Sequence, residues 1–127
     1  MGIILYLFAV LLFIPLTTIN IIIVIWKNAW TKGFLKTLNQ YFFTGAVGLD
    51  IFANYEFRTL WNTTLRTRRG YNFGIKEETI SSALGKNQQL KTLSVIGWML
   101  VYILWAIDYQ YWKKGGHCAN SIIDLQN

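Results

Sequence analysis

The segment KEETISSALGK, residues 76–86, contains three side chains that could do acid/base or nucleophilic chemistry: Glu78, Ser82 and Lys86. A helix over this segment would place Ser82 and Lys86 one turn apart. A serine beside a lysine can act as a nucleophile when the lysine is desolvated and serves as its base. We expect the helix to begin near the two glutamates and to end at Gly85, a residue type that often terminates helices. Lys86 would then fall beyond the helix, which argues against a serine and lysine pair.

His117 and Cys118 are adjacent and are the only histidine and cysteine of the chain. A single cysteine excludes an internal disulfide, and two adjacent ligands cannot complete a four-ligand zinc site, so we expect no metal. Neighbouring side chains usually diverge, but His117 could approach Glu78 or Asp108 in the fold. The candidate catalytic residues are therefore Glu78, Ser82, Asp108 and His117. A simpler interpretation is that the preceding glycine pair ends a helix and that His117 and Cys118 fix the turn after it.

The elements that must position these side chains begin with residues 1–26, which include no Asp, Glu, Lys, Arg or His. About 20 apolar residues cross a hydrocarbon core of about 30 Å, so this segment is long enough to span a membrane as a helix. Nothing basic precedes it and no small-residue cleavage site follows it, so we expect a retained transmembrane anchor rather than a cleaved secretory signal. Pro15 removes one backbone hydrogen bond near its middle, and Asn20 can bond either another helix or a local carbonyl.

A second apolar segment, residues 92–112, has an uncharged stretch of 16 residues, which is short for a span. Extended to Trp112 it is long enough, and Asp108 would lie near the far interface beside a belt of aromatic residues. The preferred interpretation is a hairpin of two spans. In the alternative, this helix lies in the head-group plane or packs on the first helix, and the polar tail, residues 113–127, stays in the cytoplasm.

Residues 27–91 hold ten of the twelve basic residues but only four of the six acidic ones. Apolar residues recur at helical spacing from Phe34 to Leu49, which predicts an amphipathic helix on the membrane surface, and GYNFG, residues 70–74, predicts a loop. Short basic segments stay in the cytoplasm near anionic head groups, so we expect a periplasmic amino terminus, a cytoplasmic segment 27–91, and lipid rather than nucleic acid as partner. The basic side chains expected to contact the lipid surface are Lys27, Lys32, Lys36, Arg58, Arg66, Arg68 and Arg69.

The spacing of the polar residues resembles a pattern in small proteins encoded by tailed phages and prophages of Gram-negative bacteria. An aspartate and an asparagine precede an ETISS-like string, a glycine with a basic residue, a leucine-rich or tryptophan-rich helix and a closing His-Cys pair. The resemblance covers about residues 49–122 and implies an origin but no activity. In those relatives the helix before the His-Cys pair often carries basic residues, which weakens the hairpin interpretation here. The polar members of a shared site would be Asp50, Asn54, Glu78, Ser81, Ser82, Asp108 and His117.

The 127 residues therefore predict a small all-α integral membrane protein. It has one transmembrane helix, a second transmembrane or interfacial helix, and amphipathic and short helices between them. A phosphate-binding glycine loop, a dinucleotide fingerprint and a helix-turn-helix pattern are not found, so we expect no cofactor and no nucleic acid.

Two functions from different classes stay open. The first is a phage or prophage protein of the host inner membrane that acts without catalysis, in lysis as a holin or holin partner, or in superinfection exclusion. It would act as a homo-oligomer or with another membrane protein. The second is a membrane-bound hydrolase or transferase that acts on lipid or cell-wall precursors through Glu78, Ser82, Asp108 and His117.

Overall fold

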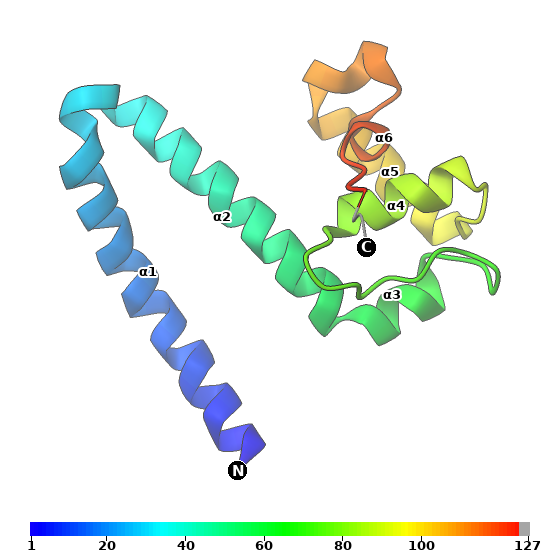
Figure 1. The fold of residues 1–127 in the computed structure, drawn as a ribbon, viewed down its shortest axis with the longest axis horizontal. Coiled ribbons are helices and arrows are strands. Elements are labelled where there is room, and N and C mark those ends of the chain that lie inside the picture. Colours follow the sequence, from blue (N-terminus) through cyan, green and yellow to red (C-terminus); the bar gives the residue numbers. More distant parts are fainter. Residues whose placement is uncertain (125–127) are drawn as a thin grey trace. The chain divides into compact units, whose positions relative to one another are not determined.

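The computed structural model describes residues 1–124, and the regular elements within them are all helices. They run in the order α1 to α5, the 3-10 helix η1, and α6 (Figure 1). The chain divides into two compact units, residues 1–46 and residues 47 onward. The all-α class predicted from the sequence is confirmed.

The first unit is dominated by α1, Gly2–Lys32, which has no buried residue and continues through Pro15. Its 31 residues extend about 46 Å at about 1.5 Å per residue, well over the thickness of a hydrocarbon core. Among residues 1–124, α1 is the one helix that is both long enough and apolar enough to cross a membrane. It ends at Gly33, whose φ of 83° lies in the left-handed region that favours glycine.

The amphipathic helix expected from Phe34 to Leu49 is present as α2, Phe34–Glu56. It continues for seven residues beyond that expectation, to Glu56. Gly45 and Gly48 lie inside it, and a Cβ at either position would meet open space. These glycines therefore neither end the helix nor receive a close neighbour.

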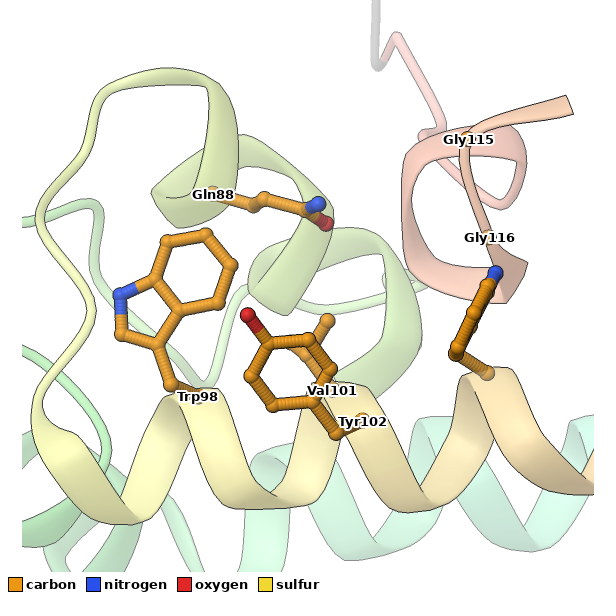
Figure 2. A pocket seen from close by; sticks show the side chains of 7 residues that line it. Gln88, Trp98, Val101, Tyr102, Gly115 and Gly116 are labelled. Carbon is orange, nitrogen blue, oxygen red and sulfur yellow. The ribbon is translucent and has the colours of Figure 1, made fainter. Parts of the chain in front are cut away.

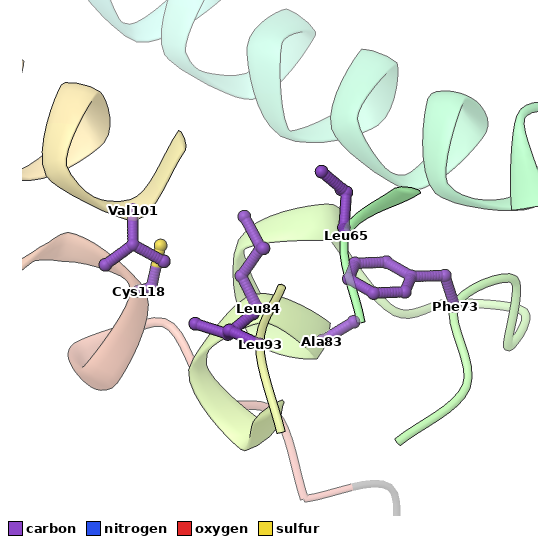
Figure 3. Packing of buried hydrophobic residues seen from close by; sticks show 7 residues of the cluster. All are labelled: Leu65, Phe73, Ala83, Leu84, Leu93, Val101 and Cys118. Atoms are coloured by element: carbon purple, nitrogen blue, oxygen red, sulfur yellow. The ribbon is translucent and has the colours of Figure 1, made fainter. Parts of the chain in front are cut away.

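The second unit contains α3, Arg58–Thr64, a loop that includes the expected GYNFG segment, and then α4, Ile80–Gln89. The apolar α5, Val95–Ile107, comes next, and a 3-10 helix, η1, Tyr109–Lys114, and the short α6, His117–Asn120, follow it. The buried core is small and joins the loop to three helices, with the side chains of Leu65, Phe73, Ala83, Leu84, Leu93, Val101 and Cys118. Figure 3 shows Val101 of α5 and Cys118 of α6 pointing toward one another in this cluster.

The expected bounds of the helix in residues 76–86 are wrong at both ends. α4 begins at Ile80, because the Thr79 side chain accepts a hydrogen bond from the Ser82 backbone N–H and caps the helix. The two glutamates therefore precede the helix instead of forming its first turn. Gly85 lies inside α4 and allows a close approach, since a Cβ there would lie 2.2 Å from the carbonyl oxygen of Cys118.

The second apolar segment forms α5, Val95–Ile107, which Ser94 caps through a hydrogen bond from the Gly97 backbone N–H. Its 13 residues extend only about 20 Å, short of a hydrocarbon core of about 30 Å. One face, with Gly97 and Val101, is buried within the second unit. This length and packing favour the interfacial alternative over the hairpin of two spans.

Candidate functional site

Glu78 lies at the centre of a polar network and is fully buried. One carboxylate oxygen, Oε1, lies 2.7 Å from Lys86 Nζ and accepts a 2.7 Å hydrogen bond from Ser82 Oγ. The other, Oε2, accepts a hydrogen bond from the Tyr71 hydroxyl at 2.9 Å. Burying a carboxylate is costly unless it is paired and hydrogen-bonded, and these three partners satisfy that requirement.

Ser82 is the candidate nucleophile, and its hydroxyl is enclosed on both sides. It donates to Glu78 and accepts a 2.9 Å hydrogen bond from the backbone N–H of Ile123. The residue has no exposed surface. A nucleophile must reach its substrate, so this geometry assigns Ser82 a role in joining α4 to the C-terminal segment.

Lys86 lies inside α4, one turn from Ser82, and not beyond the helix as expected from Gly85, but it does not have the properties of a catalytic base. Its partial burial by itself lowers the pKa, but hydrogen bonds and charge attraction from Glu78 and Tyr71 outweigh that effect and raise the pKa above 10.5. A lysine base needs a lowered pKa near neutrality. The ammonium also lies 4.6 Å from the centre of the Tyr71 ring, a cation–π contact that favours its charged form.

Asp50 and Asn54, the two upstream residues of the phage-like pattern, hold the start of α4 and the loop before it. Asp50 accepts hydrogen bonds from the backbone N–H of Ile80 at 3.0 Å and from the Ser81 hydroxyl at 2.9 Å. Asn54 is fully buried, donates to the Glu78 carbonyl at 2.8 Å and accepts from the Gly74 backbone N–H at 3.1 Å. Both side chains therefore cap backbone groups, Asp50 at the start of α4 and Asn54 in the loop before it.

His117 and Asp108 form a second polar pair, with Nδ1 and Oδ2 2.6 Å apart. The side chains are partly exposed, 30% for His117 and 24% for Asp108. The alternative in which His117 approaches Asp108 is therefore confirmed. Among the hydrogen bonds of residues 1–124, none joins this pair to Glu78 or Ser82. The four candidate residues thus form two separate pairs.

Two residues of the network were missed from the sequence, Tyr71 and Asn87. Asn87 is fully buried, accepts hydrogen bonds from the Tyr71 backbone N–H and the Thr92 hydroxyl, and donates to the carbonyls of Tyr71 and Ala83. It fixes the loop in residues 70–74 against α4. One signal in the sequence could have identified Asn87. It directly follows Lys86 and so lies on a face of α4 that is turned toward that loop.

Cys118 is buried where α6 crosses α4 at Gly85. Burial, together with the negative charge of Asp50, raises the pKa of its thiol to about 12. The reactive form of a cysteine is the thiolate, so this thiol is inert at neutral pH. This agrees with the interpretation that the His-Cys segment has a structural role.

The basic side chains expected at the lipid surface do not all point outward. Lys27, Lys32, Lys36, Arg58, Arg68 and Arg69 are exposed. Arg66 is only partly exposed and is engaged within the protein, since it donates to the Asn62 side chain and to three carbonyls of the loop, those of Thr67, Arg68 and Gly70. Arg66 therefore stabilises the loop.

A small cavity of about 110 Å³ lies between α4, α5 and the glycine pair Gly115 and Gly116. Trp98 and Tyr102 project from α5 on the side of Gln88, as Figure 2 shows, and the glycine pair closes one end. The candidate catalytic residues do not line it. Within residues 1–124, no three His, Cys, Asp or Glu side chains come together as a metal site requires.

Comparison of the chain with protein-family models, curated proteins and solved structures finds no match.

Proposed function

We propose that this is a phage or prophage protein of the bacterial inner membrane that acts on the host membrane without catalysis, in lysis or in superinfection exclusion. The observation that carries the proposal is α1, a 31-residue apolar helix with no buried residue. Exposed apolar surface of this extent is typical of a segment that lies in lipid or against other membrane helices. The phage or prophage origin rests on the sequence resemblance of residues 49–122.

The charge distribution supports an orientation with the amino terminus in the periplasm. Lys27, Lys32 and Lys36 directly follow the apolar part of α1, and residues 1–26 contain no charged side chain. Basic residues next to a span are retained in the cytoplasm, and they are attracted there by anionic lipids. Residues 27–91 would accordingly lie on the cytoplasmic side.

The exposed face of α5 supports a single span with α5 at the interface. Val95, Ile96, Met99, Ile103 and Ile107 are all more than half exposed, and they recur at the spacing of one helix face. The opposite face is covered by the second unit. Such a one-sided helix suits the boundary between head groups and acyl chains, with the C-terminal tail left in the cytoplasm.

The alternative is a membrane-bound hydrolase or transferase, and one observation favours it. The partly exposed Asp108 and His117 pair has the geometry by which a carboxylate orients an imidazole base. A nucleophile near it is not evident in the described residues, since the Ser82 hydroxyl is enclosed and the Cys118 thiol is buried. The non-catalytic function is therefore the better supported of the two.

Expression in a bacterial host separates the two functions when the membrane potential is followed with a voltage-sensitive dye. We expect the wild type to collapse the potential or to block infection by a second phage. We expect Ser82→Ala and His117→Gln to keep that effect when the amount of protein in the membrane equals that of the wild type. The exposed control Thr67→Ala should keep it as well. Loss of the effect in His117→Gln or Ser82→Ala, with the membrane level and the unfolding midpoint unchanged, would favour the enzyme. No effect of the wild type on either measurement would reject the proposed function.

A further inference from the structure

The first unit contains a polar pocket of about 320 Å³ between α1 and the first turns of α2. It is lined from α1 by Asn20, Asn28 and Lys32, and from α2 by Thr37, Gln40 and Tyr41. The residues that line it all belong to residues 1–46, and the two helices meet at Gly33 (Figure 1). Polar groups are rare on membrane-embedded helices, and Asn20 is one of them, so its position in a pocket with other polar side chains points to a ligand or a partner.

One of these groups is buried without a partner. Thr37 is only 4% exposed, and its Oγ1 makes no hydrogen bond in the described structure. A buried hydroxyl without a partner is costly, and such a group in a pocket commonly contacts a ligand or water. The Tyr41 hydroxyl accepts a 3.4 Å hydrogen bond from Asn20 Nδ2, twelve residues before Lys32 on α1, and so belongs to the other end of the pocket.

The charge of this unit selects an anion. Residues 1–46 contain three lysines and no aspartate or glutamate, so no carboxylate of the unit can neutralise Lys32. An ammonium beside hydroxyl and amide donors is a suitable set for a phosphate group, whose oxygens accept hydrogen bonds only.

The Lys32 end of the pocket fits the level of a lipid head group. Lys32 lies at the C-terminal end of α1, and the exposed Trp26 and Trp30 on the same helix are residue types that gather at the head-group level. We propose that the Lys32 end of this pocket binds the phosphate of an anionic phospholipid, with Lys32 and Thr37 as donors. The proposal rests on the membrane placement of α1 in the proposed function.

The test is the thermal unfolding of the full chain in zwitterionic detergent micelles, with phosphatidylglycerol, phosphatidylcholine or inorganic phosphate added. We expect phosphatidylglycerol to raise the unfolding midpoint of the wild type, because a ligand that binds only the folded state stabilises it. Lys32→Gln and Thr37→Val should weaken phosphatidylglycerol binding about tenfold or more. Lys27→Gln, which removes a charge of the same helix outside the pocket lining, should bind like the wild type.

Thr37→Val also separates a binding role from a structural one. Without lipid, the isosteric change removes an unsatisfied buried hydroxyl, so the midpoint should stay equal or rise. With phosphatidylglycerol, the same variant should lose the lipid-dependent rise. A structural hydroxyl would instead lower the midpoint in both conditions, and that result would overturn the proposal.

The remaining outcomes are equally decisive. A rise with inorganic phosphate alone, lost in Lys32→Gln and Thr37→Val, would support the phosphate site and assign it to a soluble anion. Equal lipid effects in all variants would overturn the proposal in favour of non-specific surface charge. A rise that depends on protein concentration and not on lipid would also overturn it, since the pocket would then receive a second copy. A chain that stays in membranes but shows no lipid-specific rise refutes this site and leaves the proposed function standing.

Discussion

At the scale of single residues, Glu78 determines how the second unit is held together. Its carboxylate gathers Lys86 and Ser82 from α4 and Tyr71 from the preceding loop. Charge-assisted hydrogen bonds of this kind are roughly twice as strong as neutral ones, but they only offset the cost of burying the charge. The network therefore specifies one arrangement of loop and helix, and removing one member leaves the others unsatisfied.

We predict that Glu78→Gln lowers the free energy of unfolding by about 2–4 kcal/mol, because it removes the partner of Lys86 from a buried site. The matched control is the exposed neighbour Glu77→Gln, which should change it by less than about 0.5 kcal/mol. Denaturant unfolding in detergent measures the free energy of unfolding of both variants. A Glu78→Gln variant as stable as its control would show that the pair contributes nothing.

We predict that the protein loses stability above about pH 9. Burial raises the pKa of the Cys118 thiol from 9.0 to about 12 and raises the pKa of the Tyr71 hydroxyl above 10.0, and Glu78 with Tyr71 raises the pKa of Lys86 above 10.5. Each group holds its proton more tightly in the folded state, so its contribution is complete below its unfolded pKa and is lost as the pH rises through the folded pKa.

Unfolding measured from pH 7 to pH 11 tests this dependence. Cys118→Ala should remove the part of the decline that begins near pH 9 and should keep the part that begins above pH 10. A stability that stays constant or rises between pH 9 and pH 11 would contradict the assigned proton affinities.

The sequence identified Glu78, Ser82, Asp108 and His117 as notable, because charged and hydroxyl side chains at helical spacing are visible without a fold. It left the partner of His117 open between Glu78 and Asp108, and it could not find the partners of Glu78 and Ser82. Glu78 bonds Tyr71 seven residues earlier, and Ser82 receives the backbone of Ile123, 41 residues later. Such contacts depend on how the loop and the tail return to α4, which no local pattern specifies.

At the scale of elements, the crossing of α4 and α6 decides the role of Gly85. The sequence predicted a helix terminator, because glycine is common at that position. In the structure the missing Cβ is used for packing, since Cys118 of α6 lies against the helix at this residue. Tertiary packing overrides the local preference, and a pattern read along one helix cannot reveal it.

We predict that Gly85→Ala destabilises the protein by about 1–3 kcal/mol or more, because the new Cβ would lie 2.2 Å from the Cys118 carbonyl oxygen. Gly48→Ala in α2 is the control, since nothing lies within 4 Å of its Cβ position. The control should be stabilised by about 0.5–1 kcal/mol, as expected for alanine in a helix. Equal shifts in the two thermal midpoints would refute the close crossing.

The second apolar element was located correctly, and its uncharged stretch ends at residue 107 as α5 does, but the extension to Trp112 that a span requires is not part of this helix. α5 stops at Ile107, where Asp108 turns the chain and bonds His117, and the aromatic residues that follow form a 3-10 helix. A hydropathy pattern counts apolar residues and does not register a turn of this kind. The lengths of the elements therefore separate α1, which can span a membrane, from α5, which lies short of it.

At the scale of the whole molecule, α1 was the most predictable feature. Residues 1–26 lack charged side chains, and that absence is readable directly from the sequence. The α1 helix extends beyond them to Lys32, and its exposed apolar surface agrees with the transmembrane prediction. The side of the membrane on which residues 27–91 lie follows from the positions of the lysines and stays a prediction.

The most direct test of the central claim is the accessibility of single cysteines to a membrane-impermeant maleimide in intact bacterial cells. Gly2→Cys marks the start of α1, and Asn72→Cys marks the exposed loop of the second unit. The buried Cys118 supplies the background, measured in the unaltered chain. We predict that residue 2 reacts in intact cells and that residue 72 reacts only after the cells are opened. Reaction of residue 72 in intact cells, or release of the chain from membranes by carbonate, would contradict the account.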